Sequence, residues 1–435
     1  MKNTFLIFLI IFCYTKSFGQ NKSNVVTTDV INFWVAFDKI TSTKDSVEQY
    51  NYLNEFFIKK GSPGLSALIE VKRYTPKLYI NAINNYPLFW KSIRENTLKA
   101  DNYAVKIESG IDKLKIIYPN LKPAKIYFTV GAMWTGGTTY KGQVLIGSEL
   151  AMTDSSTVTK ELPKSFSYLP PYFATNPINE TVFLNVHEYV HTQQKTTIGN
   201  NLLKQCVLEG VAEFVAVVAL NKTSPNQCIS FGKGNDKKIK AAFTKEIFSS
   251  LFDNWLWNDY NNQFKMRDLG YYVGYSMAEK YYKQAKDKKQ AIKEMIELDY
   301  NNELELSMYV DKSNYFGKSY KILKEQYENS RPQVVNIREF KNGNQKVNPN
   351  LTQITFEFSS VIDKRFRNFE IGPLGESNLL KLKKFVGFSE DGKSVSFEIE
   401  LKPNQQYQII VGEGFRNEQG ISLKQYLVDF KTAEK

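Results

Sequence analysis

Histidine and cysteine are scarce in this sequence, whose 435 residues include only two histidines and three cysteines. Three cysteines are too few for a fold that depends on a disulfide framework. Long hydrophobic runs are also lacking, apart from one near the N-terminus, and the mean hydropathy is −0.39, which excludes a chain that crosses a membrane many times. Runs of positive charge are short although the net charge is +12. Without a concentrated basic stripe, the composition gives no support for binding to nucleic acid.

The sequence does contain enough apolar side chain for a large core. Hydrophobic residues make up 42% of the chain and charged residues 23%, values typical of a globular protein and not of a disordered or fibrous one. The length predicts two or three domains of roughly 150 residues each. We interpret the diffuse positive charge as a solvated basic surface, which would favour association with an acidic cell envelope.

The N-terminal residues resemble a secretory signal peptide. Lys2 supplies the positive charge, residues 5–13 form a short apolar segment, and Ser17 and Gly19 are the small residues expected before a cut ahead of Gln20. The apolar segment is much shorter than the roughly 20 residues of a membrane-spanning helix. We therefore expect residues 1–19 to be removed and the protein to be exported (periplasmic, on the cell surface or secreted), with a retained anchor as the alternative.

Export would place the two remaining cysteines in an oxidising environment. A disulfide between Cys206 and Cys228 and two separate buried thiols are both compatible with the sequence.

The hydrophobic pattern changes character along the chain. Residues 20–120 have mostly helical periodicity, and residues 125–130 and 143–146 read as strands separated by the turn signal Gly136-Gly137. Helical patterns return over residues 177–325. The chain is therefore predicted to be α+β and mainly helical, with a small sheet, up to about residue 329.

From residue 330 to 435 the pattern is that of short strands. Apolar and polar residues alternate around Phe356 and Phe397, and Asn342-Gly343 and Asp391-Gly392 are typical hairpin turns. These features predict an all-β sandwich. The segment resembles the immunoglobulin-like modules of bacterial exported proteins.

Both histidines fall in one motif, His187-Glu188-Tyr189-Val190-His191. A helix is predicted here, with Asn176 as its N-cap and Pro177 as its first residue. Residues four apart share a helical face, so the two imidazoles can bind one metal ion. Glu188 lies about 100° around the helix, where it can reach a water on the metal and act as a general base.

A third metal ligand is expected further along the chain. Glu209 and Glu213 are the only charges in an otherwise apolar helical stretch of residues 206–218. Buried carboxylates are costly unless they are paired or bound to a metal. We therefore predict that Glu209 is a zinc ligand and that Glu213 bonds the second nitrogen of a ligand histidine. A pair of carboxylates that faces a solvent groove or basic residues is the alternative.

These motifs resemble the gluzincin metallopeptidases, in which a His-Glu-x-x-His helix is followed by a helix bearing a glutamate ligand. The run from Leu208 to Phe214 is similar to the Glu-Gly-x-Ala-x-aromatic run of the aminopeptidase branch. Most of the chain also resembles exported bacterial proteins predicted to be zinc-dependent proteases. The resemblance implies a thermolysin-like peptidase domain over residues 20–329, with a catalytic part at 121–329, and a single Zn²⁺ ion.

The resemblance also raises the question of a transition-state tyrosine. Tyr271 and Gly274 match a Tyr-x-x-Gly run of the aminopeptidase branch, so the Tyr271 phenol is a candidate donor to the oxyanion, with an ordinary core or surface tyrosine as the alternative. The Gly-x-Met-Glu-Asn strand of that branch is missing. We expect the strand at residues 143–146 to be the edge that pairs with an extended peptide.

The predicted activity is hydrolysis of a peptide or protein substrate by a zinc-activated water, with Glu188 as the general base. One alternative is a zinc hydrolase that acts on a different bond. Another is a surface or adhesion protein whose catalytic apparatus is vestigial. The sequence indicates no particular oligomeric state.

Overall fold

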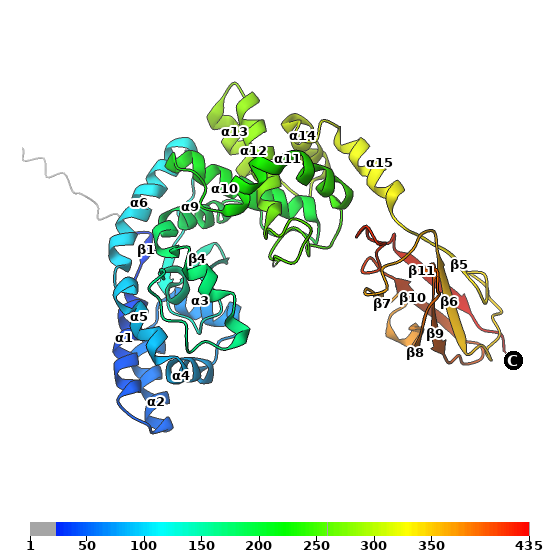
Figure 1. Ribbon diagram of the computed structural model, residues 1–435, viewed down its shortest axis with the longest axis horizontal. Coiled ribbons are helices and arrows are strands. Elements are labelled where there is room, and N and C mark those ends of the chain that lie inside the picture. The colour runs from blue at the N-terminus through cyan, green and yellow to red at the C-terminus, as the bar shows by residue number, and fades with distance from the viewer. Residues whose placement is uncertain (1–22, 259, 435) are drawn as a thin grey trace, which may run out of the picture.

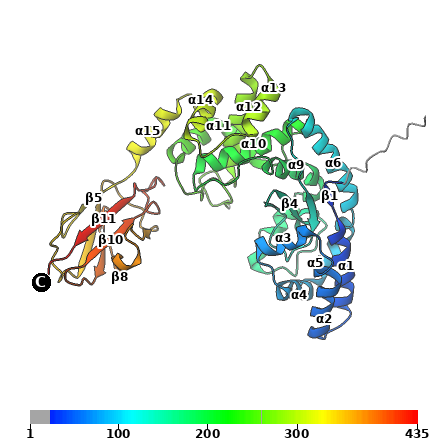
Figure 2. The ribbon, with the colours of Figure 1, turned by 180° about the vertical axis from the view of Figure 1, so that it is seen from behind.

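The computed structural model describes residues 23–258 and 260–434 (Figure 1). The predicted signal peptide lies outside the described residues. Figures 1 and 2 show the chain from opposite sides, with helices α1–α6 at one end, helices α9–α14 in the middle and the C-terminal strands at the other end.

Helices form most of the chain up to residue 330. They are α1 (Thr28–Thr41), α2 (Ser46–Leu53), α3 (Pro63–Lys72), α4 (Pro76–Asn85), α5 (Pro87–Thr97), α6 (Ala100–Ile117), α7 (Ser148–Ala151), α8 (Leu169–Phe173), α9 (Thr181–His191), α10 (Leu202–Leu220), α11 (Gln227–Glu246), α12 (Leu269–Gln284), α13 (Lys288–Ile296), α14 (Glu303–Ser313) and α15 (Tyr320–Ser330).

Strands form a small N-terminal sheet and then dominate the C-terminal region. They are β1 (Val25–Val26), β2 (Ile126–Thr129), β3 (Gly137–Tyr140), β4 (Gln143–Gly147), β5 (Val334–Ile337), β6 (Gln353–Phe358), β7 (Phe369–Glu370), β8 (Leu382–Phe388), β9 (Ser394–Ile399), β10 (Gln406–Val411) and β11 (Tyr426–Lys431). The chain is therefore α+β, as predicted, with a mainly helical part and a β-rich C-terminal region.

The N-terminal helices begin at residues that suit a helix start. Ser62 and Thr75 accept hydrogen bonds from the first free backbone N–H groups of α3 and α4, and a proline follows each of them. The buried faces of α1 and α5 meet in an aromatic cluster, where the ring centroids of Phe33 and Trp90 are 4.8 Å apart. The prediction of a helical N-terminal part is thus confirmed.

The N-terminal sheet has the strand order β1-β2-β4-β3. The strand predicted at residues 143–146 is β4, but it lies between β2 and β3, so the prediction that it forms the edge is wrong. The strand at the edge beside β4 is β3, which pairs antiparallel with β4 through a tight turn at Lys141 and Gly142, both at positive φ. Gly136-Gly137 leads into β3 and is not the hairpin turn itself.

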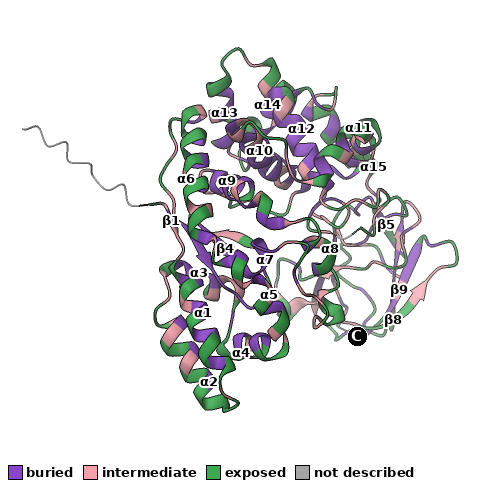
Figure 3. Cartoon of the chain, turned by 60° about the vertical axis from the view of Figure 1, so that its left-hand side comes forward, coloured by how far each residue is buried: buried purple, intermediate pink, exposed green. Residues whose placement is uncertain are grey.

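Helices α10 and α12 cross at unusually short range because each has a glycine at the crossing. A Cβ atom on Gly210 would lie 2.1 Å from the backbone of Gly274 and Tyr275, and one on Gly274 would lie 1.7 Å from the carbonyl oxygen of Cys206. Both helices are largely buried, whereas α2 at the N-terminal end has many exposed residues (Figure 3). The two glycines bring Glu209, next to Gly210, close to the first turn of α12.

The C-terminal strands form two sheets, ordered β5-β6-β9-β8 and β11-β10-β7. Side chains from both sheets share one core, which includes Phe356, Phe397 and Phe430. The predicted strands around Phe356 and Phe397 are β6 and β9, and the predicted turn at Asp391-Gly392 joins β8 to β9. The two sheets agree with the all-β pattern of the sequence.

Contacts join this region to the end of α15 and to the segment that follows α11. Arg331 donates to Glu413 at 2.7 Å and to the carbonyl oxygen of Leu423 at 2.6 Å. Ser250 donates to Glu413 at 2.6 Å, and Arg416 lies 3.1 Å from Asp253. Within residues 23–258 and 260–434, no helix combines the length and the apolar composition needed to cross a bilayer.

Candidate metal centre

Helix α9 carries both histidines on one face. The α-helix begins at Thr181, four residues later than predicted, because Pro177–Glu180 form a 3-10 turn. Asn176 makes no side-chain cap there, since its Oδ1 accepts a hydrogen bond from the backbone N–H of Ser155. The predicted N-cap is therefore wrong, but the helical face that pairs His187 with His191 is as predicted.

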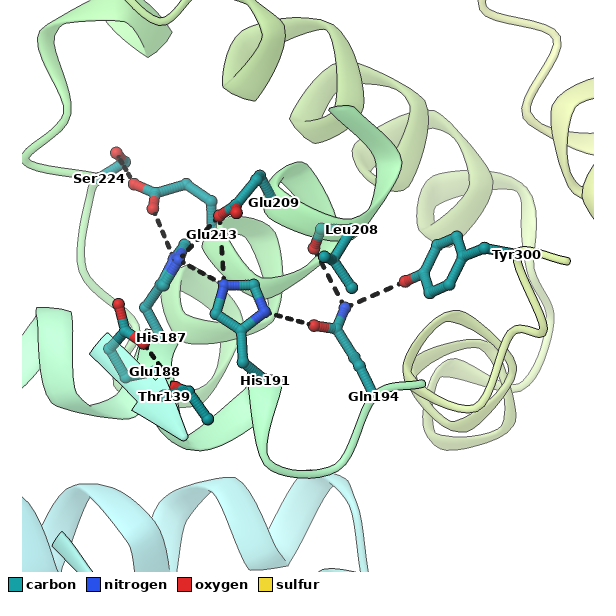
Figure 4. Close-up of polar contacts among 10 residues, drawn as sticks. All are labelled: Thr139, His187, Glu188, His191, Gln194, Leu208, Glu209, Glu213, Ser224 and Tyr300. Atoms are coloured by element: carbon teal, nitrogen blue, oxygen red, sulfur yellow. Dashed lines mark hydrogen bonds and ion pairs between the residues drawn. The ribbon is translucent and has the colours of Figure 1, made fainter. Parts of the chain in front are cut away.

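Three side-chain atoms converge where α9 packs on α10. The Nε2 atoms of His187 and His191 are 3.1 Å apart, and Oε2 of Glu209 lies 3.2 Å from Nε2 of His191 and 3.5 Å from Nε2 of His187 (Figure 4). All three residues are buried. The trio is close enough to bind one metal ion.

The spacing of the three atoms suits a tetrahedral ion. Two ligands that are each about 2.0–2.1 Å from a tetrahedral metal lie about 3.3 Å from one another. The observed separations of 3.1, 3.2 and 3.5 Å lie on either side of that value. The residues present therefore fit the metal that the sequence motif implies.

Glu213 lies on the far side of His187 from this point. Its Oε2 is 2.9 Å from Nδ1 of His187, an ion-pair distance, and its Oε1 accepts a hydrogen bond from the hydroxyl of Ser224. Glu213 thus lies beside the second nitrogen of His187, with an ion pair in place of the predicted hydrogen bond. Histidine ligands usually have such a partner for their second nitrogen.

His191 has a different partner, which the sequence did not predict. Nδ1 of His191 lies 2.7 Å from Oε1 of Gln194. The amide nitrogen of Gln194 donates to the carbonyl oxygen of Leu208 at 3.1 Å and to the hydroxyl of Tyr300 at 3.2 Å, so the amide oxygen must be the atom that faces His191. His191 then donates from Nδ1 and presents the lone pair of Nε2. The available signal was a polar residue three positions after the second histidine.

The carboxylates of the centre favour positive charge on His187. Burial alone would lower the pKa of His187, but the carboxylates of Glu209 and Glu213 raise that pKa to about 10. Burial raises the pKa of Glu209, but the two imidazoles outweigh burial and hold that pKa well below its usual range. Carboxylates that stabilise the protonated form of an imidazole also stabilise other cations at the same place. The centre therefore favours binding of a cation.

Glu188 lies beside this centre on the wall of a pocket of about 530 Å³. The hydroxyl of Thr139, on β3, donates to Oε2 of Glu188 at 2.7 Å. His191, Glu209 and Tyr271 line the same pocket. The carboxylate is therefore positioned by the edge strand and faces the space next to the converging ligand atoms.

Lys72, at the end of α3, is a second neighbour of Glu188 that the sequence did not indicate. Burial lowers the pKa of Lys72, and the negative charge of Glu188 acts in the opposite direction. This lysine belongs to a helix far from Glu188 in the chain, so no local pattern could have linked the two residues.

Tyr271 also lies at the centre. Its ring stacks on the ring of His187, with centroids 6.1 Å apart and an angle of 22° between the planes. Burial and the charge of Glu209 raise the pKa of Tyr271 well above its ordinary value of 10, so the phenol keeps its proton. Tyr271 lines the pocket near the converging ligands and also packs against the hydrophobic core of the helical part.

Cys206 and Cys228 are both free and buried, so the disulfide that the sequence left open is not formed. A Cβ atom on Gly270 would lie 2.7 Å from Sγ of Cys206, which therefore packs against the start of α12. The group of residues close enough to bind a metal contains His187, His191 and Glu209 and not Cys206.

Comparisons with known proteins identify no family. No protein-family model matches the sequence, and no curated protein matches it either. Two solved structures align with 94% of this chain: the S-layer protein rSbsC, at 10% identity and a TM-score of 0.19, and the N-terminal part of the bacterial S-layer protein SbsC, at 11% identity and a TM-score of 0.18. The chain spans 45% of the first structure and 77% of the second. Likenesses at these TM-scores carry no conclusion about fold or function.

Proposed function

We propose that this protein is an exported, zinc-dependent peptidase of the gluzincin type. The observation that carries the proposal is the convergence of His187, His191 and Glu209 on one point beside a pocket, with Glu188 on the pocket wall. The thermolysin-like class of the domain and its export, which the sequence predicts, are parts of the same proposal.

Zinc is the metal that suits this donor set. Two imidazole nitrogens and one carboxylate oxygen are typical ligands of catalytic zinc, which keeps a further position for water or substrate. A structural zinc site would normally have four protein ligands. A zinc ion at this site would act as a Lewis acid and would lower the pKa of a water bound to it to about 7.

The roles of the protein side chains follow from their positions. Glu188, oriented by Thr139, takes a proton from water and returns it to the leaving amine nitrogen. The Tyr271 phenol, which keeps its proton, donates a hydrogen bond to the developing oxyanion. Glu213 and Gln194 orient the two histidines.

A peptide is the substrate that best suits the wall of the pocket. The pocket is lined by Gly137, Thr138 and Thr139 of the edge strand β3. One side of β3 pairs with β4, and no strand of the described residues pairs with its other side. An extended chain can add to such an edge through backbone hydrogen bonds. This favours a peptide over a substrate that has no extended backbone.

The test is hydrolysis of casein and of a peptide library by the mature protein, before and after removal of metal with a chelator and again after zinc is restored. Turnover should vanish on chelation and return with zinc. Glu188→Gln should lower kcat at least a hundredfold while zinc remains bound, because general-base catalysis contributes about 10²–10⁴-fold.

Two other results would give the site a different role. Hydrolysis of ester or amide substrates with no peptide turnover would identify a hydrolase of another class. Zinc binding with no turnover of any substrate would favour the surface or adhesion protein with a vestigial site. Full activity of the Glu188→Gln variant would refute the role given to Glu188.

A further inference from the structure

The side chain of Trp257 is the most exposed large apolar group on the wall of the site pocket. Its exposed fraction is 55%, whereas Leu208, which lines the same pocket, is only 6% exposed. The rest of the lining is mostly polar and includes Thr139, Glu188 and Lys141. An exposed indole in a pocket leaves apolar surface that a ligand can cover.

The position of Trp257 is held by specific contacts. Its backbone N–H donates to Oδ1 of Asp268 at 2.7 Å, and the ring of Phe252 packs edge-on against the indole with centroids 5.5 Å apart. The residue has φ of 52°, a left-handed conformation that costs a non-glycine residue roughly 1–2 kcal/mol. A large aromatic residue in this conformation must be held by its surroundings, and such positions cluster at functional sites.

Trp257 is also tied to the helix that carries Tyr271. Asp268, which receives the N–H of Trp257, directly precedes α12, and its own N–H donates to the side chain of Asn258 at 2.8 Å. The carbonyl oxygen of Trp255 accepts the N–H of Gly270 at 2.7 Å. The indole and the Tyr271 phenol are therefore positioned by one hydrogen-bonded unit.

A peptide bound along β3 would direct side chains into this pocket. Successive side chains of an extended chain point to opposite sides, so every second one can enter the space that β3, Glu188 and Trp257 line. Two residues adjoin a scissile bond that is held next to Glu188 and Glu209. Alternation directs the side chain of one of them into this space, where the indole forms the exposed apolar wall.

We propose that Trp257 determines specificity by receiving an aromatic or large aliphatic side chain of the residue that adjoins the scissile peptide bond. The inference rests on the proposed peptidase function and adds the class of substrate to it. A ring or a branched alkyl group covers the exposed indole, whereas alanine leaves it in water and a charged group loses hydration there.

The experiment compares fluorogenic peptides that are identical except for the residue beside the cleaved bond, which is Phe, Ala or Lys. The zinc-loaded wild-type protein should cleave the Phe peptide with kcat/KM at least about tenfold above that of the Ala peptide, the ratio that corresponds to 1.4 kcal/mol. Trp257→Ala should reduce this ratio to about threefold or less, because the loss of kcat/KM falls mainly on the Phe peptide. Trp257→Phe should keep most of the preference.

Trp134→Ala is the matched control. Trp134 is 49% exposed and packs on Tyr74 with ring centroids 5.4 Å apart, and it is not among the residues that line the pocket. The Phe/Ala ratio should be unchanged in this variant. Trp257→Gln provides a second test if Trp257→Ala folds poorly, and the zinc content of each variant confirms that the centre is intact.

The outcomes separate the two proposals. A wild-type protein that cleaves none of the peptides contradicts the peptidase function itself. Peptide cleavage with a Phe/Ala ratio that Trp257→Ala and Trp257→Gln leave unchanged overturns the role of Trp257 alone. A preference for the Lys peptide that depends on Trp257 would also overturn the inference, because the indole would then attract a cation.

Discussion

At the scale of single residues, the two histidines of the centre are oriented by different kinds of partner. Glu213 brings a carboxylate to Nδ1 of His187, whereas Gln194 brings a neutral amide oxygen to Nδ1 of His191. A second carboxylate near His191 would add to the negative charge that Glu188, Glu209 and Glu213 already supply. The amide fixes the ring without adding charge.

Gln194 can be tested by its effect on metal affinity. Gln194→Ala removes the acceptor for Nδ1–H of His191 and frees the ring to rotate, so zinc affinity should fall about 10–100-fold. The measurement is competition for zinc with a chelating dye. Gln193→Ala is the control, because Gln193 points instead to Lys122 and Thr192 and should bind zinc as the wild type does. Equal affinities for the two variants would contradict the role of Gln194.

The sequence predicted the residues of the centre whose signal is local. The spacing of His187 and His191 and the two acids in an apolar helix depend only on helix geometry and on the cost of buried charge. The sequence did not predict Gln194, Thr139 or Trp257 as site residues. Each of them lies on a loop or strand that folds back to the site. The path of such a segment is set by tertiary contacts and not by a short motif.

At the scale of helices and strands, the crossing of α10 and α12 determines where Glu209 and Tyr271 meet. The sequence predicts no structural role for Gly210 and Gly274 beyond their place in a family pattern. Their role is steric, because either Cβ atom would enter the backbone of the other helix. Tyr271 precedes Gly274 by about one helical turn, so the tight contact at Gly274 also fixes where the Tyr271 phenol lies.

Gly274→Ala should therefore destabilise the protein by at least about 2 kcal/mol, since overpacking of a tight contact costs about 1–3 kcal/mol and here the backbones themselves must separate. The measurement is urea unfolding. Gly234→Ala on α11 is the control, because nothing lies within 4 Å of the added methyl group. The control should be neutral or stabilising by up to about 1 kcal/mol. A Gly274→Ala variant as stable as the wild type would contradict the steric account.

A buried acid in α7 gives the fold a dependence on pH. Oε2 and Oε1 of Glu149 accept hydrogen bonds from the backbone N–H groups of Gly131 and Met133, at 2.9 and 3.1 Å. Burial raises the pKa of Glu149 from 4.5 to about 7, in spite of these bonds. The folded protein therefore binds a proton more tightly than the unfolded chain does.

The sign of the effect follows from linkage. The stabilising contribution of Glu149 is fully present below pH 4.5 and is lost as the pH rises through 7, a change of roughly 3 kcal/mol at 1.36 kcal/mol per pKa unit. Urea unfolding of the wild type and of Glu149→Gln between pH 4.5 and 8 isolates this group, because glutamine does not titrate. The stability of the wild type relative to the variant should fall across this range. A constant difference between the two proteins would contradict the shift.

The elements themselves were predicted unevenly. The helices of the N-terminal part and the strands β6 and β9 follow from clear periodicities of apolar residues. The short strand β3, with the sequence Gly-Thr-Thr-Tyr, has no buried alternation and was missed, so β4 was taken for the edge. The start of α9 was placed too early because Asn176 and Pro177 resemble a helix start but lead into a 3-10 turn.

At the scale of the whole molecule, the change from helices to strands near residue 330 was visible in the sequence, but the contacts across it were not. Arg331 is largely buried and links α15 to the C-terminal strands through Glu413 and Leu423. Ser250 shares the Glu413 carboxylate, so the C-terminal region contacts the segment that leads to Trp257. These polar contacts join residues more than 80 positions apart, which no local pattern predicts.

The central claim is that His187, His191 and Glu209 bind one zinc ion. The most direct test is the metal content of the purified mature protein, measured by elemental mass spectrometry after extensive dialysis. The account predicts one zinc ion per chain in the wild type and in Glu188→Gln, and almost none in His187→Ala or Glu209→Ala. A wild-type protein that retains no zinc, or a Glu209→Ala variant that retains as much zinc as the wild type, would contradict it.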